Sequence, residues 1–133
     1  ESLFPNFESL VEDINGNQLL HVPEGKLTAW GQYVVPLSGG SQVEFVGIYS
    51  WTDEVYFSPF ERETEKAEAY DRLDLRANWT SADSNWAVSA FVNNVFDDIA
   101  NLQILRQGEA EFFRHTSGTT VPRLFGLEVQ YSY

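Results

Sequence analysis

The sequence predicts an all-β fold, an antiparallel up-and-down meander of five or six strands. Segments such as Phe125–Tyr133 alternate large apolar residues with small or polar ones, the period of a strand with two unlike faces. No stretch shows the apolar spacing of a helix, and no apolar run approaches the ~18 residues of a membrane helix. Tight turns also alternate with long connections, as in a meander.

The first part of the chain contains a loop and two strands. Residues 1–24 have no sustained period and contain two prolines, so we expect a long loop there. The first strand is expected from Gly25 to Leu37, and Ser38–Ser41 is expected to form a hairpin turn. The second strand is expected from Gln42 to about Phe57, longer than most strands of globular sheets.

The second part alternates in the same way. Residues 58–67 are expected to form a charged loop, and Glu68–Thr80 has the cleanest alternation. A short turn over residues 81–84 leads to the strand Asn85–Phe96. Residues 97–120 form a long connection, into which Ile99–Arg106 and Glu111–His115 could extend the neighbouring strands. Val121–Tyr133 supplies the last strand.

The long and short connections alternate along the chain, which places the long loops at one end of the meander and the tight turns at the other. Long loops at one end and tight turns at the other are typical of outer-membrane barrels. Trp79, Trp86 and Tyr133 lie near tight-turn ends, where an aromatic girdle would meet the membrane boundary. We therefore expect the apolar side chains, which occupy every second position along the strands, to face lipid. The residues for which we make this prediction are Leu73, Leu75, Trp79, Val88, Leu127 and Val129.

Five or six strands are too few to close a membrane barrel, since the smallest single-chain barrels have eight. The remaining strands must come from a removed N-terminal part, another chain or further copies of this one. The chain contains no Met, so we expect it to begin after processing or to be a piece of a longer protein.

Composition excludes several functions. The net charge of −12, with few and scattered basic residues, argues against a nucleic-acid partner. Cysteine is absent, which excludes disulfides and thiolate metal sites. We find no nucleophile, base and orienting group in a catalytic arrangement, so we expect no enzyme activity. Asp97-Asp98 is expected to form a turn, and His21 and His115 to be solvated loop residues, with no metal or cofactor bound.

Four motifs resemble the end of the barrel of TonB-dependent outer-membrane receptors. Asp13–Leu19 with Pro23 resembles the Gly-Asn…Pro segment that opens a late strand of that family. Arg72–Trp79 is similar to the following strand, which ends in a short periplasmic turn.

The other two motifs lie nearer the C-terminus. Trp86 with Asn94–Asp97 is similar to the Asn-Leu-Phe-Asp signature at the top of the penultimate strand. Pro122–Gly126 with Tyr133 resembles the last strand. The resemblance covers most of the chain from about residue 13, and its order and spacing fit the final quarter of the family's barrel.

The resemblance implies that residues 1–133 are the C-terminal segment of a 22-stranded barrel in the outer membrane of a Gram-negative bacterium. Such receptors take up scarce nutrients such as ferric siderophores, cobalamin or oligosaccharides. The plug domain and the box that engages the TonB complex are absent from this sequence. The implied partners are outer-membrane lipid, the remaining strands and plug, TonB through that missing part, and the barrel-assembly machinery. That machinery would read Phe125, Leu127, Val129, Tyr131 and Tyr133 as its signal.

Candidate ligand contacts are the loop aromatics Phe57, Phe60, Phe112 and Phe113, which could instead pack loop on loop. The acidic stretch Glu61–Glu68 could capture a cation or simply be solvated. Arg72, Asp74 and Arg76 share the polar face, where we expect cross-strand ion pairs or contacts with the plug.

Two other functions remain open. One is a soluble β-sandwich binding module for carbohydrate, which would use the loop aromatics. The other is a self-assembling β-protein, in which several copies complete a sheet through their edges. Solubility without detergent would distinguish the module from the barrel segment, and mass measurement in detergent would identify self-assembly.

Overall fold

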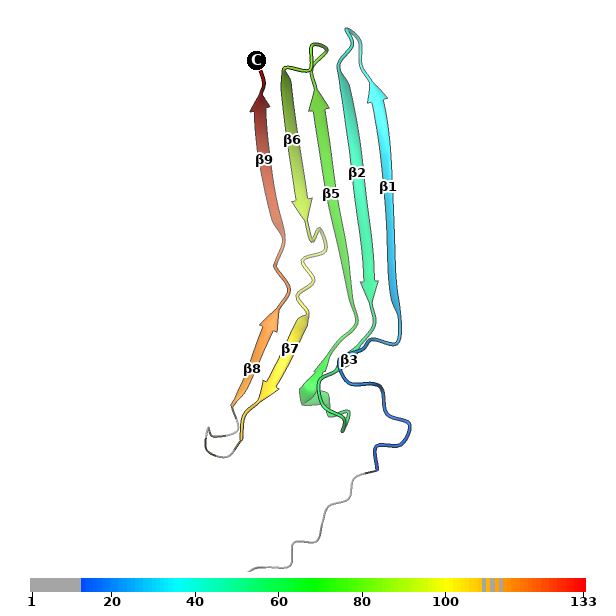
Figure 1. The fold of residues 1–133 in the computed structure, drawn as a ribbon, viewed down its shortest axis with the longest axis vertical. Coiled ribbons are helices and arrows are strands. Elements are labelled where there is room, and N and C mark those ends of the chain that lie inside the picture. The colour runs from blue at the N-terminus through cyan, green and yellow to red at the C-terminus, as the bar shows by residue number, and fades with distance from the viewer. Residues whose placement is uncertain (1–12, 109, 111, 113) are drawn as a thin grey trace, which may run out of the picture.

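The computed structural model of the chain describes residues 13–108, 110, 112 and 114–133. One antiparallel sheet has the strand order β1-β2-β5-β6-β9 (Figure 1). Neighbours in this sheet follow one another along the chain once two short hairpins are set aside, which confirms the predicted meander. The five strands are β1 Lys26–Pro36, β2 Gln42–Thr52, β5 Tyr70–Thr80, β6 Trp86–Asn93 and β9 Leu124–Tyr131.

Both predicted tight turns are present, at the same end of the sheet (Figure 1). Leu37 donates its backbone N–H to the Ser41 carbonyl at 2.9 Å across the first turn. Gly39 and Gly40 have φ of 88° and 89°, a region that glycine enters without steric cost. In the second turn the N–H of Ser81 donates to the carbonyl of Trp86 at 2.9 Å.

The second strand was predicted too long, since β2 ends at Thr52 instead of near Phe57. The N–H of Asp53 donates to Gly25, whereas the N–H of Glu54 donates to the Asp53 carboxylate at 2.9 Å. An aspartate that accepts the next N–H offers the backbone an alternative to the ladder. The chain therefore leaves the sheet at this point.

Residues 58–67 were predicted as a charged loop, but part of this segment has regular structure. A 3₁₀ turn η1 spans Glu63–Glu65, and β4 Lys66–Ala67 pairs antiparallel with β3 Val55–Tyr56. The connection after β6 also forms a hairpin, of β7 Asn101–Arg106 and β8 His115–Thr119. The predicted extension Ile99–Arg106 contains β7, but β7 pairs with β8 and does not extend β6, and of the described residues of Glu111–His115 only His115 is in a strand.

His115 was predicted to lie in a loop, and it is instead the first residue of β8, paired with Arg106. Residues 111 and 113 of the predicted extension lie outside the described residues. Both hairpins extend beyond the end of the sheet opposite the tight turns (Figure 1). The sheet therefore has short connections at one end and long ones at the other, as predicted.

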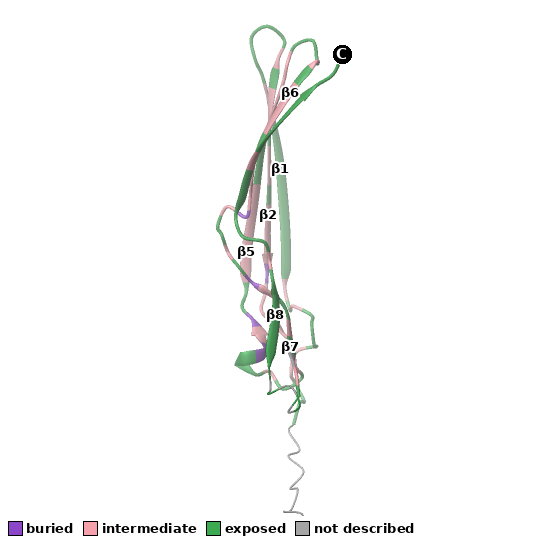
Figure 2. Cartoon of the chain, turned by 90° about the vertical axis from the view of Figure 1, so that its left-hand side faces the viewer, coloured by how far each residue is buried: buried purple, intermediate pink, exposed green. Residues whose placement is uncertain are grey.

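The sheet is a single layer, seen nearly edge-on in Figure 2. Among the described residues the buried apolar side chains are Ala67 and Ala100, and neither belongs to the five long strands. The described part of the chain thus has no hydrophobic core between two layers. Neither face of the five-stranded sheet is therefore covered by a second layer of the described chain.

Candidate functional site

One face of the sheet is apolar across all five strands. The pairing of the strands places their apolar alternate positions side by side. Gly31, Gly47, Leu75, Val92 and Phe125 form one cross-strand row. The next row toward the tight turns, and the one after it, are also apolar throughout. These rows are Tyr33, Phe45, Ala77, Ala90 and Leu127, then Val35, Val43, Trp79, Val88 and Val129.

Aromatic residues border these rows at both ends of the apolar face. Toward the hairpins, Tyr49 and Trp51 project from β2, and Trp51 pairs with Leu27. Toward the tight turns, Trp86 pairs with Tyr131, and their ring centroids lie 4.7 Å apart. The rows between carry aliphatic and small residues together with four aromatics, Tyr33, Phe45, Trp79 and Phe125.

All six residues predicted to face lipid lie on this apolar face. Leu75, Leu127 and Val129 keep 44%, 70% and 57% of their surface exposed. Leu73, Trp79 and Val88 are half-buried by their neighbours in the sheet. No second sheet of the described chain covers them, and their contact with lipid stays a prediction.

The predicted assembly signal lies on the same face at the edge strand β9. Phe125, Leu127, Val129 and Tyr131 alternate along β9 and are all exposed. Tyr133 follows the strand and is fully exposed. Recognition of these residues by an assembly machinery stays a prediction.

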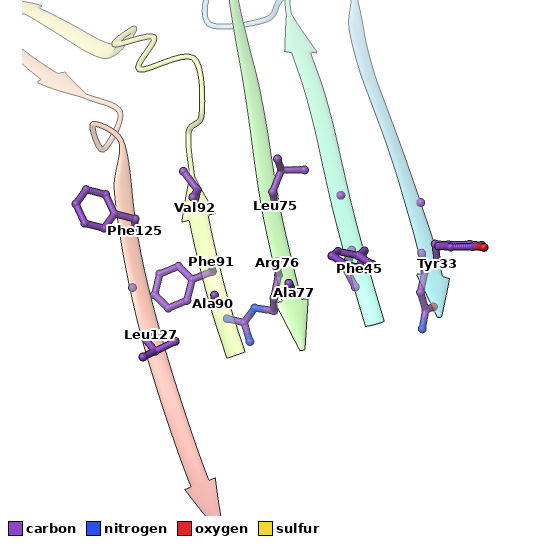
Figure 3. A pocket seen from close by; sticks show the side chains of 15 residues that line it. Tyr33, Phe45, Leu75, Arg76, Ala77, Ala90, Phe91, Val92, Phe125 and Leu127 are labelled. Carbon is purple, nitrogen blue, oxygen red and sulfur yellow. The ribbon is translucent and has the colours of Figure 1, made fainter. Parts of the chain in front are cut away.

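Small residues produce a shallow groove of about 1060 Å³ in the middle of the apolar face (Figure 3). Gly31, Gly47, Ala77 and Ala90 leave room that larger side chains fill elsewhere in these rows. The walls of the groove are apolar, among them Phe45, Leu75, Val92, Phe125 and Leu127.

The opposite face is mostly polar and hydrogen-bonded across strands, although it also exposes Trp30, Val34 and Ile48. Glu44 of β2 accepts hydrogen bonds from Gln32 of β1 and from Asn78 of β5, the latter at 2.8 Å. This carboxylate therefore joins three neighbouring strands through their side chains. Such a face is suited to water or to another polar protein surface.

The arginines of β5 form no cross-strand ion pair with described residues, whereas the predicted contact with a plug stays a prediction. Arg72 pairs with Asp74 of the same strand, Nε to Oδ1 at 3.0 Å, so the expected cross-strand ion pair is not formed by these residues. Arg76 instead places its guanidinium 5.4 Å from the ring centre of Phe91 on β6. A cation over an aromatic face is attracted by the ring quadrupole.

Asn94, directly after β6, is the most buried of the described side chains, with 2% of its surface exposed. Its N–H donates to the Asp74 carboxylate at 2.7 Å, and its Nδ2 donates to the carbonyls of Asp98 and Val121 at 2.9 and 3.1 Å. Its φ of 53° lies in the left-handed region, which Asn tolerates better than most residues. Asn94 thus joins β5, the turn after β6 and the segment before β9.

The turn after β6 is centred on Val95 and Phe96 and is closed by Asp97, so the predicted turn pair Asp97-Asp98 lies at its end. The N–H of Asp97 donates to the carbonyl of Asn94 at 3.0 Å. The Asp97 carboxylate accepts the N–H of Arg123 at 2.8 Å, and Asp98 accepts the N–H of Asp71 at 3.1 Å. Both carboxylates therefore hold backbone in place.

The three loop aromatics that the structure describes do not gather into one site. Phe57 and Phe60 line a pocket of about 390 Å³ with Ile104 and Leu105 of β7. Phe112 lies outside that pocket with 93% of its surface exposed. Phe113 lies outside the described residues. Ligand contact by any of these four residues stays a prediction.

The acidic stretch surrounds one lysine. Lys66 Nζ lies 2.9, 3.2 and 3.4 Å from carboxylate oxygens of Glu63, Glu68 and Glu54. The hydrogen bond to Glu63, followed by that to Glu68, raises the pKa of Lys66 above its usual range. Among residues 13–108, 110, 112 and 114–133, no three His, Cys, Asp or Glu side chains gather as a metal site would require.

Comparison with protein-family models, curated proteins and solved structures found no match. Within the described part of the chain, no helix has the length and apolarity needed to cross a membrane.

Proposed function

We propose that this chain is part of an outer-membrane β-barrel receptor that takes up a scarce nutrient by active transport. One observation carries the proposal: a five-stranded sheet exposes an apolar face between two borders of aromatic residues. Membrane barrels expose such a band to lipid, with aromatic girdles at both interfaces.

The height of the apolar band supports this environment. Val43 lies eight positions from Trp51 on β2, and the cross-strand row of Val43 contains Val88 of β6. Trp86 lies two positions beyond Val88, so the band from Trp51 to Trp86 spans ten positions. Ten steps of ~3.4 Å give roughly 34 Å of strand, or roughly 24–28 Å of height at a tilt of 35–45°. The apolar band of known membrane barrels is about 25 Å tall.

The directions of the edge strands favour additional strands from a different source over a ring of copies. β1 and β9 run in the same direction, because four antiparallel pairings separate them (Figure 1). Copies inserted in one orientation would therefore pair β9 with β1 in parallel, unlike every pairing within the sheet. An antiparallel barrel requires an odd number of further strands, at least three if eight is the minimum.

The transport role follows from the motif resemblance to TonB-dependent receptors. In this proposal the polar face around Glu44 and Arg76 borders the lumen, and the two hairpins lie at the outer end. The tight turns lie at the periplasmic end. Energy coupling through TonB would require the plug and N-terminal part of the receptor.

Fluorescent labels on the two faces of β9 test the proposal. Because the chain has no cysteine, single cysteines at Leu127 and Val129, and matched ones at Glu128 and Gln130, can each carry an environment-sensitive fluorophore. The chain is folded in phospholipid vesicles, and quenching by brominated acyl chains is measured. We expect strong quenching at 127 and 129 and weak quenching at 128 and 130.

Two results would contradict the membrane proposal. One is equal quenching of both parities by a water-soluble quencher, with none from lipid. The other is a monomeric, detergent-free chain in which labels at 127 and 129 are shielded from both quenchers, as in a sandwich core. The second result would favour the soluble binding module.

A further inference from the structure

A small open cavity, lined by charged and hydroxyl-bearing residues together with apolar surface, lies where the β7–β8 hairpin meets the polar face of the sheet. Its volume is about 280 Å³, and it is separate from the apolar groove and from the pocket at Phe57. We name it the hydroxyl pocket. Its lining residues are Lys26, Ser50, Thr52, Tyr70, Arg72, Leu102, Thr119, Thr120 and Val121.

The strand registers bring the sheet side of this pocket together. Lys26 pairs with Thr52, and Thr52 pairs with Tyr70, so one row runs across β1, β2 and β5. Ser50 and Arg72 form the neighbouring row on the same face. Three strands thus direct two cationic and three hydroxyl side chains to one place.

The hairpin closes the pocket from the other side. The Thr120 hydroxyl accepts the N–H of Ala100 at 3.0 Å, which ties the segment after β8 to the segment before β7. This contact holds Thr119 beside Leu102 at the pocket wall. The side chain of Asn94, directly after β6, donates to the carbonyls of Asp98 and Val121 and so joins this end of the hairpin to the sheet.

Most polar groups of the pocket have no partner among the residues that the structure describes. Within the described part of the chain, the ammonium of Lys26 forms no ion pair, and the terminal nitrogens of Arg72 make no hydrogen bond because Asp74 takes only its Nε. The hydroxyls of Ser50, Thr52, Tyr70 and Thr119 likewise make no hydrogen bond to described residues. Polar groups that surround a cavity without protein partners are available to a ligand.

The charge of the pocket is unusual for this chain. Eight basic residues face twenty acidic ones in the sequence, yet two of the eight line this one cavity. Cationic nitrogens recognise carboxylate and phosphate oxygens, and hydroxyls both donate to and accept from ligand hydroxyls. A cavity of this size admits only a compact ligand.

We propose that the hydroxyl pocket binds a compact hydroxylated anion, of the size of a monosaccharide with one phosphate or carboxylate group. Lys26 and Arg72 hold the oxyanion, and the four unpartnered hydroxyls hold the hydroxyl groups of the ligand. The inference goes beyond the proposed function, because it requires only this pocket and not a lipid-covered apolar face.

Binding of three related probes tests the proposal on the full chain folded in detergent micelles. Glucose 6-phosphate and glucuronate provide the phosphate and the carboxylate, and glucose provides hydroxyl groups without charge. Amide NMR shifts report saturable binding at Ser50 and Thr119. We expect at least one anionic sugar to bind roughly tenfold or more tightly than glucose, because charge-assisted hydrogen bonds are about twice as strong as neutral ones.

Two pairs of variants locate the site. Lys26→Gln should weaken binding of the anionic sugar roughly tenfold, whereas Lys66→Gln, which removes a charge outside the pocket, should not change it. Thr119→Val should weaken binding severalfold, whereas Thr116→Val on the same strand should not.

Several results would overturn the proposal. They are the absence of saturable binding to the folded chain, equal binding of glucose and the anionic sugars, and equal effects of Lys26→Gln and Lys66→Gln. Inorganic phosphate that binds as tightly as glucose 6-phosphate would remove the role of the hydroxyls and overturn it as well. None of these results depends on the lipid-quenching pattern of β9, so the two proposals can fail separately.

Discussion

The ring of Phe91 on β6 covers the backbone of Gly126, its register partner on β9. A Cβ at position 126 would lie 2.5 Å from Cζ of Phe91, closer than side chains approach one another. The aromatic ring thus takes the place that a side chain on β9 would occupy, an arrangement that pins strand register.

Gly126→Ala should therefore weaken the β6–β9 pairing. The ring of Phe91 must move and lose its contact with Arg76, and overpacking of this kind costs about 1–3 kcal/mol. Urea unfolding in detergent micelles, followed by circular dichroism, measures the change in the free energy of unfolding.

Gly31→Ala is the matched control for that measurement. A Cβ at Gly31 of β1 would meet no atom within 4 Å, so the free energy of unfolding should change by less than about 0.5 kcal/mol. Equal losses in the two variants would show that the contact with Phe91 does not matter. Adding Phe91→Leu to Gly126→Ala should recover part of the loss.

Asn94→Gly should destabilise the connection between β6 and β9 by about 2 kcal/mol or more. The substitution permits the positive φ but removes the side chain whose Nδ2 donates to the carbonyls of Asp98 and Val121. Faster amide exchange of Asp98, whose N–H donates to the Asn94 side chain, would measure the opening. Asn93→Gly, at a neighbouring position without such bonds, should leave that exchange rate unchanged.

Asp83 in the second tight turn should titrate below its ordinary pKa of 3.8. The hydroxyl of Ser81 donates to the carboxylate, and the N–H of Asn85 also donates to it, so both lower the pKa of Asp83. A lowered pKa in the folded state means that this stabilisation is present above pH 3.8 and is lost as pH falls through the lower value.

Carboxyl ¹³C shifts measured against pH give the titration midpoint of Asp83. Ser81→Ala should move the midpoint upward, toward 3.8, because the largest cause of the shift is removed. A midpoint that stays in place after this substitution would exclude the Ser81 hydroxyl as the cause.

Lys66→Gln should loosen the β3–β4 hairpin and leave the five-stranded sheet intact. Without the ammonium, the carboxylates of Glu54, Glu63 and Glu68 would repel one another. Hydrogen exchange should accelerate at Tyr56 and Lys66 but not in β5, and Lys66→Arg should restore protection. Uniform acceleration over both regions would show that the hairpin and the sheet open together.

The sequence was sufficient to predict the apolar face, because the period of two along a strand is a local property. Leu73, Leu75 and Trp79 share a parity, and the structure places that parity on one face with Val88 and Val129. The tight turns were also predictable, since Gly39 and Gly40 supply the positive φ that such a turn needs.

The end of β2 and the hydroxyl pocket were not predictable from local patterns. The strand ends where Asp53 bonds to its neighbour, although Val55 and Phe57 resume the apolar alternation beyond it. The pocket requires Lys26, Thr52 and Tyr70 to be neighbours, which depends on the register between strands. The only sequence signal was their shared parity on the polar face.

The bond from Asn94 to Val121 has a consequence for how the sheet forms. Three of its four strand pairings join segments with short or moderate connections, whereas β6 and β9 must find each other across residues 94–123. Closing a long loop costs entropy and slows folding, so β9 should be the last strand to dock. The bonds from Asn94 to Val121 and from Arg123 to Asp97 hold the two ends of that loop next to each other. Once they form, β9 can pair with β6 residue by residue from Leu124 onward.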